Sequence, residues 1–146
     1  MNFASTNARS LAPKIGSAID YINELDLDFL VITETWLRNG RTLENNVKDL
    51  ELGTGISIVH RAREGRRGGG VGILYKPEKI SLKQLPLKAN NYEVVAASGK
   101  FRNNTRRICI IAVYVPPDSN AMKWEDMTAF LVDNIFRVKV LSLIHI

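Results

Sequence analysis

A carboxylate that directly follows a short apolar run is the first candidate for chemistry in this sequence. Glu34 stands after residues 29–32 (Phe-Leu-Val-Ile) and Thr33, and such a continuous apolar run is typical of a strand buried on both faces. Proteins of α/β architecture place their ligands at the carboxyl ends of such strands. Carboxylate oxygens are natural ligands of Mg²⁺, which takes one or two of them and keeps several waters. Glu34 is therefore a candidate metal ligand, and a surface glutamate that begins a loop is the alternative.

Two further polar residues stand at predicted strand ends and could join Glu34. Asn7 ends a weak strand at residues 2–7, and parallel pairing with the strand before Glu34 would place both residues at one edge. An amide there can hold a phosphate oxygen or a water without adding charge, although turn formation alone also explains an asparagine. Tyr114 follows the apolar run at residues 108–113, and a phenol at a strand end can donate to a phosphate oxygen. A half-buried tyrosine with a solvated hydroxyl is the alternative.

A basic loop rich in glycine spans residues 61–70. It carries four arginines before three consecutive glycines: Arg61, Arg63, Arg66 and Arg67. Arginine forks match phosphate geometry, and glycine lets the backbone approach a ligand closely. No Gly-Lys-Ser or Gly-Lys-Thr follows, and a strand comes next, so this is not a phosphate-binding P-loop. We favour contact with nucleic acid, with a solvated hairpin that protects a sheet edge by its charge as the alternative.

Histidine and cysteine residues indicate no further catalytic or metal-binding pattern. We expect His60 to lie in a strand and to face solvent, and His145 stands near the C-terminal end of the sequence. The single cysteine, Cys109, lies inside an apolar run, where a small buried side chain is the expected role. No spacing of Cys and His residues suggests zinc. No disulfide can form within the chain, as suits a reducing compartment.

Strands and two helices must position these residues. A stripe of apolar residues at helical spacing, with Ser10 able to cap it, predicts an amphipathic helix over residues 11–25. The order strand, helix, strand at the start indicates an α/β unit. Further strands are predicted from residue 56 onward and at residues 71–75, 80–87, 92–100 and 107–115, with a long connection at 38–55. A second helix is expected from about residue 123, with four side chains facing inward: Trp124, Met127, Phe130 and Leu131.

Composition places the chain among folded proteins that suit anionic partners. Its 146 residues suffice for one domain, and 45% hydrophobic with 24% charged residues argue against disorder. The net charge of +5 favours nucleic acid as a partner. No apolar stretch approaches the ~20 residues of a transmembrane helix, and no signal-peptide pattern opens the chain. We therefore expect an intracellular protein with no membrane partner.

Four segments, in this order, resemble the apurinic-type endonuclease domain of LINE-type (non-LTR) retrotransposons, within the endonuclease/exonuclease/phosphatase superfamily. They are Asn-Ala-Arg-Ser-Leu at residues 7–11, the stretch 28–37 that contains Thr-Glu-Thr-Trp-Leu, the stretch 66–73 with its three glycines, and Val-Tyr-Val-Pro-Pro at 113–117. The likeness runs from about residue 2 to residue 136. The second segment and its spacing from the first are the most specific part.

The resemblance implies a four-layered α/β sandwich with a divalent-metal site, for Mg²⁺ or Mn²⁺, at one edge. By position in the motifs, Glu34 takes the metal-binding role, Asn7 lies by the metal and the scissile phosphate, and Tyr114 contacts the phosphate. The implied activity is the nicking of a DNA strand, which primes reverse transcription of the element's RNA. DNA is then the substrate, a reverse transcriptase region follows in the same polyprotein, and the nucleus is the place of action.

Two elements of the family pattern are absent from this sequence. A Gly-Asp-Phe-Asn element, which positions the attacking water and the leaving group, and a Ser-Asp-His element, which completes the site, do not occur. We therefore interpret residues 1–139 as a truncated domain that is inactive alone, and we expect the apolar strands at 29–32 and 108–113 to be left partly uncovered. Residues 141–146 (Leu-Ser-Leu-Ile-His-Ile) match one reading frame of a sequencing-library adaptor. Residues 140–146 are therefore interpreted as a non-native tail, with a natural apolar strand as the alternative.

Two other functions stay open at this point. A phosphatase of the same fold could act on a phosphorylated lipid or sugar, because fold alone does not decide between the chemistries. The arginine loop and the Thr-Glu-Thr-Trp-Leu segment favour the nuclease. A decayed copy that binds nucleic acid weakly, without catalysis, is the third interpretation.

Overall fold

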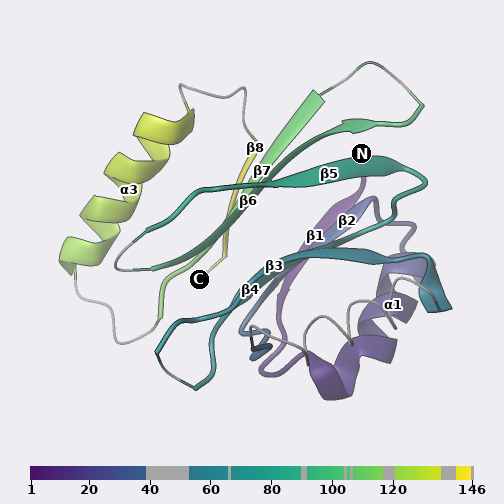
Figure 1. Cartoon of the computed structure of the whole chain (residues 1–146), viewed down its shortest axis with the longest axis horizontal. Coiled ribbons are helices and arrows are strands. Elements are labelled where there is room, and N and C mark those ends of the chain that lie inside the picture. Colours follow the sequence, from purple (N-terminus) through teal and green to yellow (C-terminus); the bar gives the residue numbers. More distant parts are fainter. Residues whose placement is uncertain are drawn as a thin grey trace.

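The computed structural model describes residues 1–38, 53–65, 67–89, 92–103, 105, 107–116, 121–135 and 141–145. These residues form four layers in the order helix, sheet, sheet, helix (Figure 1). The first sheet has the strand order β1-β2-β4-β3, and the second has the order β5-β6-β7-β8. The four-layered α/β sandwich expected from the sequence is confirmed.

The elements follow the predicted order along the chain. The first sheet contains β1 (Phe3–Asn7), β2 (Phe29–Thr33), β3 (Ser57–Arg61) and β4 (Val71–Tyr75). The second contains β5 (Ile80–Leu85), β6 (Glu93–Phe101), β7 (Arg107–Tyr114) and β8 (Leu141–His145). Helix α1 (Ile15–Glu24) covers the first sheet and α3 (Ala121–Ile135) covers the second. Within the described ranges, no helix has the length and apolar character that crossing a bilayer requires.

Strand β2 is buried on both faces, as its continuous apolar run predicts. Phe29 and Val31 pack into the core between the two sheets. Leu30 and Ile32 point to the other side, where they pack with Ile22 of α1. A strand between two apolar layers needs apolar residues at every position, which explains the lack of alternation.

Strand β7 is likewise covered on both faces within the described part of the chain. Ile108 and Ile110 face the core between the sheets, whereas Ile111 packs with Met127 and Leu131 of α3. The expectation that strands 29–32 and 108–113 are left uncovered is therefore wrong for these faces, because α1 and α3 supply the outer layers. The inward positions of Met127 and Leu131 are confirmed, and the side chain of Trp124 lies outside the described part.

The first predicted helix is shorter than expected and begins differently. A 3-10 turn at Ala12–Lys14 precedes α1, and no side-chain cap forms at either start. Ser10 does not cap the helix because it has a φ of +85°, and its amide donates to the carbonyl of Glu34 at 2.9 Å. The chain follows the edge of the sheet at this point before it turns into the helix.

Strand pairing brings three chain segments to one edge of the first sheet. β1 and β2 are parallel, with Asn7 opposite Thr33. β4 runs antiparallel to β2, with Val71 opposite Thr33, and pairs with β3 so that Arg61 is opposite Val71. The carboxyl ends of β1 and β2 therefore meet the start of β4. We refer to this place as the carboxyl edge.

The C-terminal residues continue the second sheet. Strand β8 pairs in parallel with β7, from Ile110 opposite Leu141 to Tyr114 opposite His145. This pairing concerns the conformation of residues 141–145 and not their origin, so the adaptor interpretation stays a prediction. Most of the predicted long connection at residues 38–55 lies outside the described residues.

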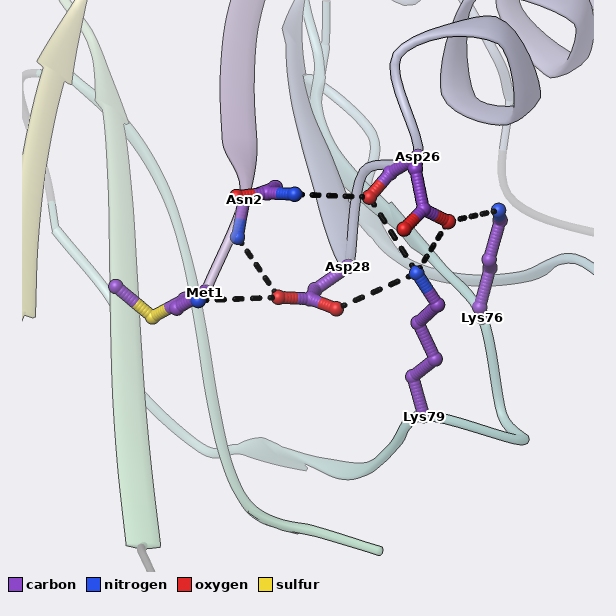
Figure 2. Close-up of polar contacts among 6 residues, drawn as sticks. All are labelled: Met1, Asn2, Asp26, Asp28, Lys76 and Lys79. Atoms are coloured by element: carbon purple, nitrogen blue, oxygen red, sulfur yellow. Dashed lines mark hydrogen bonds and ion pairs between the residues drawn. The ribbon is translucent and has the colours of Figure 1, made fainter. Parts of the chain in front are cut away.

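An ionic cluster ties the strands together at the opposite edge (Figure 2). The Nζ atom of Lys79 lies 2.5 Å from Oδ1 of Asp26 and 3.8 Å from Oδ1 of Asp28. The buried Lys76 lies 3.5 Å from the same Asp26 oxygen, and the amide of Asn2 donates to Asp28 at 2.8 Å. These contacts join the starts of β1 and β2 to the end of β4, away from Glu34.

Candidate active site

Two backbone segments are hydrogen-bonded to Glu34 and its neighbours at the carboxyl edge. From the β1 side, the amides of Ala8, Ser10 and Leu11 donate to the carbonyls of residues 33, 34 and 35 over 2.9 to 3.0 Å. From the glycine run, carbonyls of residues 70 and 69 accept from the amides of Thr35 and Trp36 at 3.2 and 2.7 Å. The backbone on either side of Glu34 is thus fixed from both directions.

The carboxyl edge also concentrates unfavourable backbone conformations. The left-handed region is occupied by four residues with side chains: Arg9 (φ +43°), Ser10 (+85°), Glu34 (+51°) and Trp36 (+53°). Such a conformation costs on the order of 1–3 kcal/mol for each residue and persists only where surrounding bonds impose it. Strain of this kind gathers at functional sites, and here it surrounds the candidate metal ligand.

The structure brings Glu34 and Tyr114 into direct contact. The Tyr114 hydroxyl at the end of β7 donates a hydrogen bond to Oε1 of Glu34, which follows β2. Burial raises the pKa of Tyr114 to about 12, and the hydrogen bond to Glu34 and its charge act in the same direction. The phenol therefore remains a proton donor at neutral pH and fixes one oxygen of the carboxylate.

The Glu34 carboxylate suits a divalent cation. It is half-buried, and none of the ion pairs in the described part of the chain involves it. A partly desolvated carboxylate without a cationic partner favours the approach of a metal ion. The described residues contain no group of three or more Asp, Glu, His or Cys side chains that could hold a metal. Any further ligands would be water or groups outside these residues.

Asn7 lies at the same edge and forms a local turn. Its Oδ1 accepts the amide of Arg9 at 3.1 Å, which matches the turn-forming alternative. The side chain is exposed, and its Nδ2 group has no hydrogen-bond partner in the described ranges. The Asn7 amide can therefore still donate to an oxygen that arrives from solution.

Glu93 is a site residue that the sequence analysis missed. It lies opposite Tyr114 on β6, and its two carboxylate oxygens accept from Nε of Arg63 and from the amide of Gly70. Glu93 thereby connects the glycine run to the second sheet. The available signal was a lone carboxylate directly before the apolar residues 94–97.

The glycine run is explained by internal packing. Gly70 has a φ of +88°, and a Cβ there would lie 2.5 Å from Oγ1 of Thr35. A Cβ at Gly69, with a φ of +67°, would lie 2.5 Å from Oε1 of Glu93. Larger residues would therefore separate the loop from Thr35 and Glu93. The sequence analysis had instead attributed the three glycines to the close approach of the backbone to a ligand.

The four arginines of the loop differ in their surroundings. Arg61 donates through Nη1 to the carbonyl of Leu87, and Arg63 is paired with Glu93. Arg67 is exposed, and Arg66 lies outside the described residues. Among the loop arginines that the structure describes, Arg67 is the one whose side chain is exposed and available to a phosphate.

The expectation that His60 faces solvent is wrong. Its Nε2 lies 2.8 Å from Oγ1 of the buried Thr35, and its Nδ1 is buried without a partner among the described residues. Burial lowers the pKa of His60 to about 4, so the ring is neutral at neutral pH. The residue lies on the outward face of β3, where Thr35 from the segment after Glu34 contacts it, so its side chain is half-buried.

Comparisons with known proteins agree with this architecture. Residues 1–130 match the sequence profile of the Endonuclease/Exonuclease/phosphatase family. No curated protein sequence matches the chain. Among solved structures, a conserved protein of unknown function from Enterococcus faecalis V583 is similar with a TM-score of 0.70 and 19% identity. The similarity covers 99% of this chain and 66% of that one.

Two other similar structures have described activities. The 3′ phosphatase NExo from Neisseria, bound to a product DNA hairpin, gives a TM-score of 0.65 at 18% identity, over 99% of this chain and 56% of that one. The endonuclease domain of TRAS1, a telomere-specific non-LTR retrotransposon, gives a TM-score of 0.64 at 13% identity, over 96% of this chain and 57% of that one. At such identities the likeness shows a shared fold. The chain spans 56 to 66% of the length of these three proteins.

Proposed function

Because the chain belongs to the Endonuclease/Exonuclease/phosphatase family, we propose that it is the N-terminal part of a metal-dependent DNA endonuclease of the LINE-type retrotransposon kind. The observation that carries the proposal is the contact between Glu34 and Tyr114 at the edge where Asn7 ends β1. The proposal therefore rests on one carboxylate that is held by a phenol and has no ion-pair partner among the described residues, at the edge where Asn7 ends the neighbouring strand. The proposed reaction is hydrolysis of a phosphodiester bond, which nicks one DNA strand.

Each residue has a definite part in the proposed mechanism. Glu34 would hold Mg²⁺ or Mn²⁺, which when bound polarises a phosphate oxygen and stabilises the charge that develops there. Asn7 would donate from its exposed amide to another phosphate oxygen. Tyr114 orients the Glu34 carboxylate. Since a phenol has a single hydrogen, Tyr114 reaches the phosphate as a donor only after it releases Glu34.

The remaining machinery is proposed to lie in chain that follows residue 139. A nucleophile must be positioned and the leaving group protonated, and the Gly-Asp-Phe-Asn and Ser-Asp-His elements that do this in the resembled domain are absent here. A reverse transcriptase region in the same polyprotein and action in the nucleus belong to the same proposal.

A phosphatase is the second candidate, because the Neisseria 3′ phosphatase is as similar in structure as the TRAS1 domain. Fold alone does not separate these chemistries. The exposed Arg67 beside the glycine run and the Thr-Glu-Thr-Trp-Leu motif around Glu34 favour the endonuclease.

The test uses a domain completed with the sequence that follows residue 139 in its transcript. Supercoiled plasmid and a 3′-phosphorylated oligonucleotide are each incubated with Mg²⁺ and the wild-type domain or Glu34→Gln. We expect plasmid nicking, which Glu34→Gln reduces by orders of magnitude because a neutral amide loses the charge that holds the ion. Asp28→Asn, at the opposite edge, is the control and should nick normally.

Each other outcome selects a different function. Phosphate release without nicking would favour the phosphatase. The absence of both nicking and phosphate release would favour a non-catalytic remnant. Normal nicking by Glu34→Gln at limiting Mg²⁺ would show that Glu34 is not the metal ligand.

A further inference from the structure

Trp36 is a large apolar side chain on the surface directly beside the candidate active site. It stands two residues after Glu34 and is 49% exposed, whereas Thr35 between them is fully buried. The other exposed large hydrophobic residues in the described part belong to α1 or its C-cap, to α3 or to the start of the chain: Met1, Phe3, Tyr21, Leu25 and Val132. Trp36 is thus the exposed aromatic ring of the carboxyl edge.

The position of Trp36 is fixed although its ring is exposed. Its φ of +53° is a conformation that bulky residues rarely adopt. The conformation is imposed by the bond from its amide to the carbonyl of Gly69 and by the bond from Thr35 to Gly70. The ring lies along Gly68, where an added Cβ would be 3.5 Å from Nε1 of Trp36. The strained backbone therefore presents about half of the ring to solvent beside the carboxyl edge, and strain of this kind gathers at ligand-binding positions.

The surroundings of the ring identify the kind of ligand. Glu34, the proposed metal ligand, is two residues away, and the exposed Arg67 precedes Gly68 in the adjacent loop. A ligand that fits here carries negative charge next to a flat apolar group. A nucleotide of a DNA strand combines these features, because each base is attached beside its phosphate and offers a π-face to an aromatic ring.

Resting on the proposed DNA substrate, we propose that Trp36 is a stacking platform for a nucleobase of the strand whose phosphate lies at Glu34. Stacking on an aromatic ring accepts every base, so it would supply affinity with little sequence preference. Arg67 would contact a neighbouring phosphate. The ring thereby holds the nucleotide while the carboxyl edge holds its phosphate.

The test compares two oligonucleotides with the same number of phosphates, one with bases and one abasic throughout. Fluorescence anisotropy gives the Kd of the 146-residue chain for each, without metal and at several salt concentrations. The variants are Trp36→Asn, since asparagine tolerates a left-handed backbone, and Trp36→Phe, which keeps a ring. Tyr21→Asn, in the second half of α1, is the control for loss of an exposed aromatic residue.

We expect the wild-type chain to bind the oligonucleotide with bases on the order of ten-fold more tightly than the abasic one. Trp36→Asn should remove this preference without changing the salt dependence, because no charge is lost. Trp36→Phe and Tyr21→Asn should keep the preference. A preference that survives in Trp36→Asn, or equal wild-type binding to both oligonucleotides, would overturn the stacking role and leave DNA binding intact. Absence of binding to either would overturn the proposed DNA substrate itself.

Discussion

Glu34 and Tyr114 lie 80 positions apart in the sequence, and a single hydrogen bond joins them across the two sheets. The phenol stays protonated because burial and the neighbouring carboxylate raise its pKa to about 12. The carboxylate is consequently oriented before any metal binds. Next to Glu34, Oγ1 of Thr35 and Nε2 of His60 form a second polar pair, 2.8 Å apart.

His60 makes a testable contribution to acid sensitivity. Its pKa is lowered to about 4 in the folded protein because burial penalises the charged ring, whereas an unfolded histidine titrates near 6.5. The unfolded state therefore binds a proton first as pH falls from 6.5 to 4, and the free energy of unfolding should decrease over that window by about 3 kcal/mol. Urea denaturation at several pH values measures this loss.

His60→Gln provides the comparison, because glutamine does not titrate. Between pH 6.5 and 4 only the wild type loses stability through residue 60, whereas all other titrating groups are shared by both proteins. Any excess of the wild-type unfolding free energy over that of the variant should therefore shrink or reverse in this window. Asp26, whose pKa the ion pair with Lys79 lowers, is present in both proteins, so its contribution cancels in the difference. A wild-type pH profile parallel to that of His60→Gln would show that the imidazole is solvated after all.

At the level of elements, the hairpin between β3 and β4 combines two tasks. Its inner part packs against the sheets, since Arg61 binds the carbonyl of Leu87 and Arg63 binds Glu93. Its tip remains exposed at Arg67. The loop is therefore neither a simple phosphate cradle nor a simple solvated hairpin.

This division predicts unequal effects of arginine substitutions on DNA binding. Arg67→Ala should weaken binding similarly on all DNA sequences and flatten the slope of log K against log[salt] by roughly 0.9, the value for one lost phosphate contact. Arg61→Ala should leave the slope unchanged, because its guanidinium is engaged internally. Binding isotherms at graded salt measure both. Equal slopes for Arg67→Ala and wild type would show that the loop tip is a solvated hairpin that does not contact a phosphate.

Over the whole molecule, the two sheets and two helices bury three apolar clusters within the described residues. The inner cluster joins β2 and β4 to β6 and β7, and each outer cluster joins one sheet to its helix. The strands expected to be exposed are covered. Within the described residues, the chain therefore forms closed apolar layers.

We therefore predict that the 146-residue chain unfolds cooperatively but does not nick DNA. Missing preorganised groups each cost several kcal/mol of transition-state stabilisation, roughly 2.7–4 for one oxyanion donor, and several such groups are absent together. Thermal unfolding monitored by circular dichroism and relaxation of supercoiled plasmid with Mg²⁺ are the two measurements. Nicking above background that disappears in Glu34→Gln would contradict the prediction, because this chain would then suffice for catalysis.

The sequence by itself predicted most of the elements and the strand ends at which three candidate site residues lie. Buried strands at residues 29–32 and 108–113, a helix within residues 11–25 and the hairpin around the glycines follow from local periodicity and turn residues, which depend on near neighbours in the chain. Parallel pairing of the first two strands then places Asn7 near Glu34. Residue types and spacing were enough for these inferences.

Only the tertiary structure decided which polar groups meet. His60 is half-buried because Thr35, in the segment after Glu34, packs against it, and alternation along a strand contains no information about such a contact. Glu93 binds Gly70 and Arg63 because two sheets approach each other at this edge. Hydrogen bonds and burial between distant segments depend on packing of the whole molecule, so they had no signature in any local stretch of sequence.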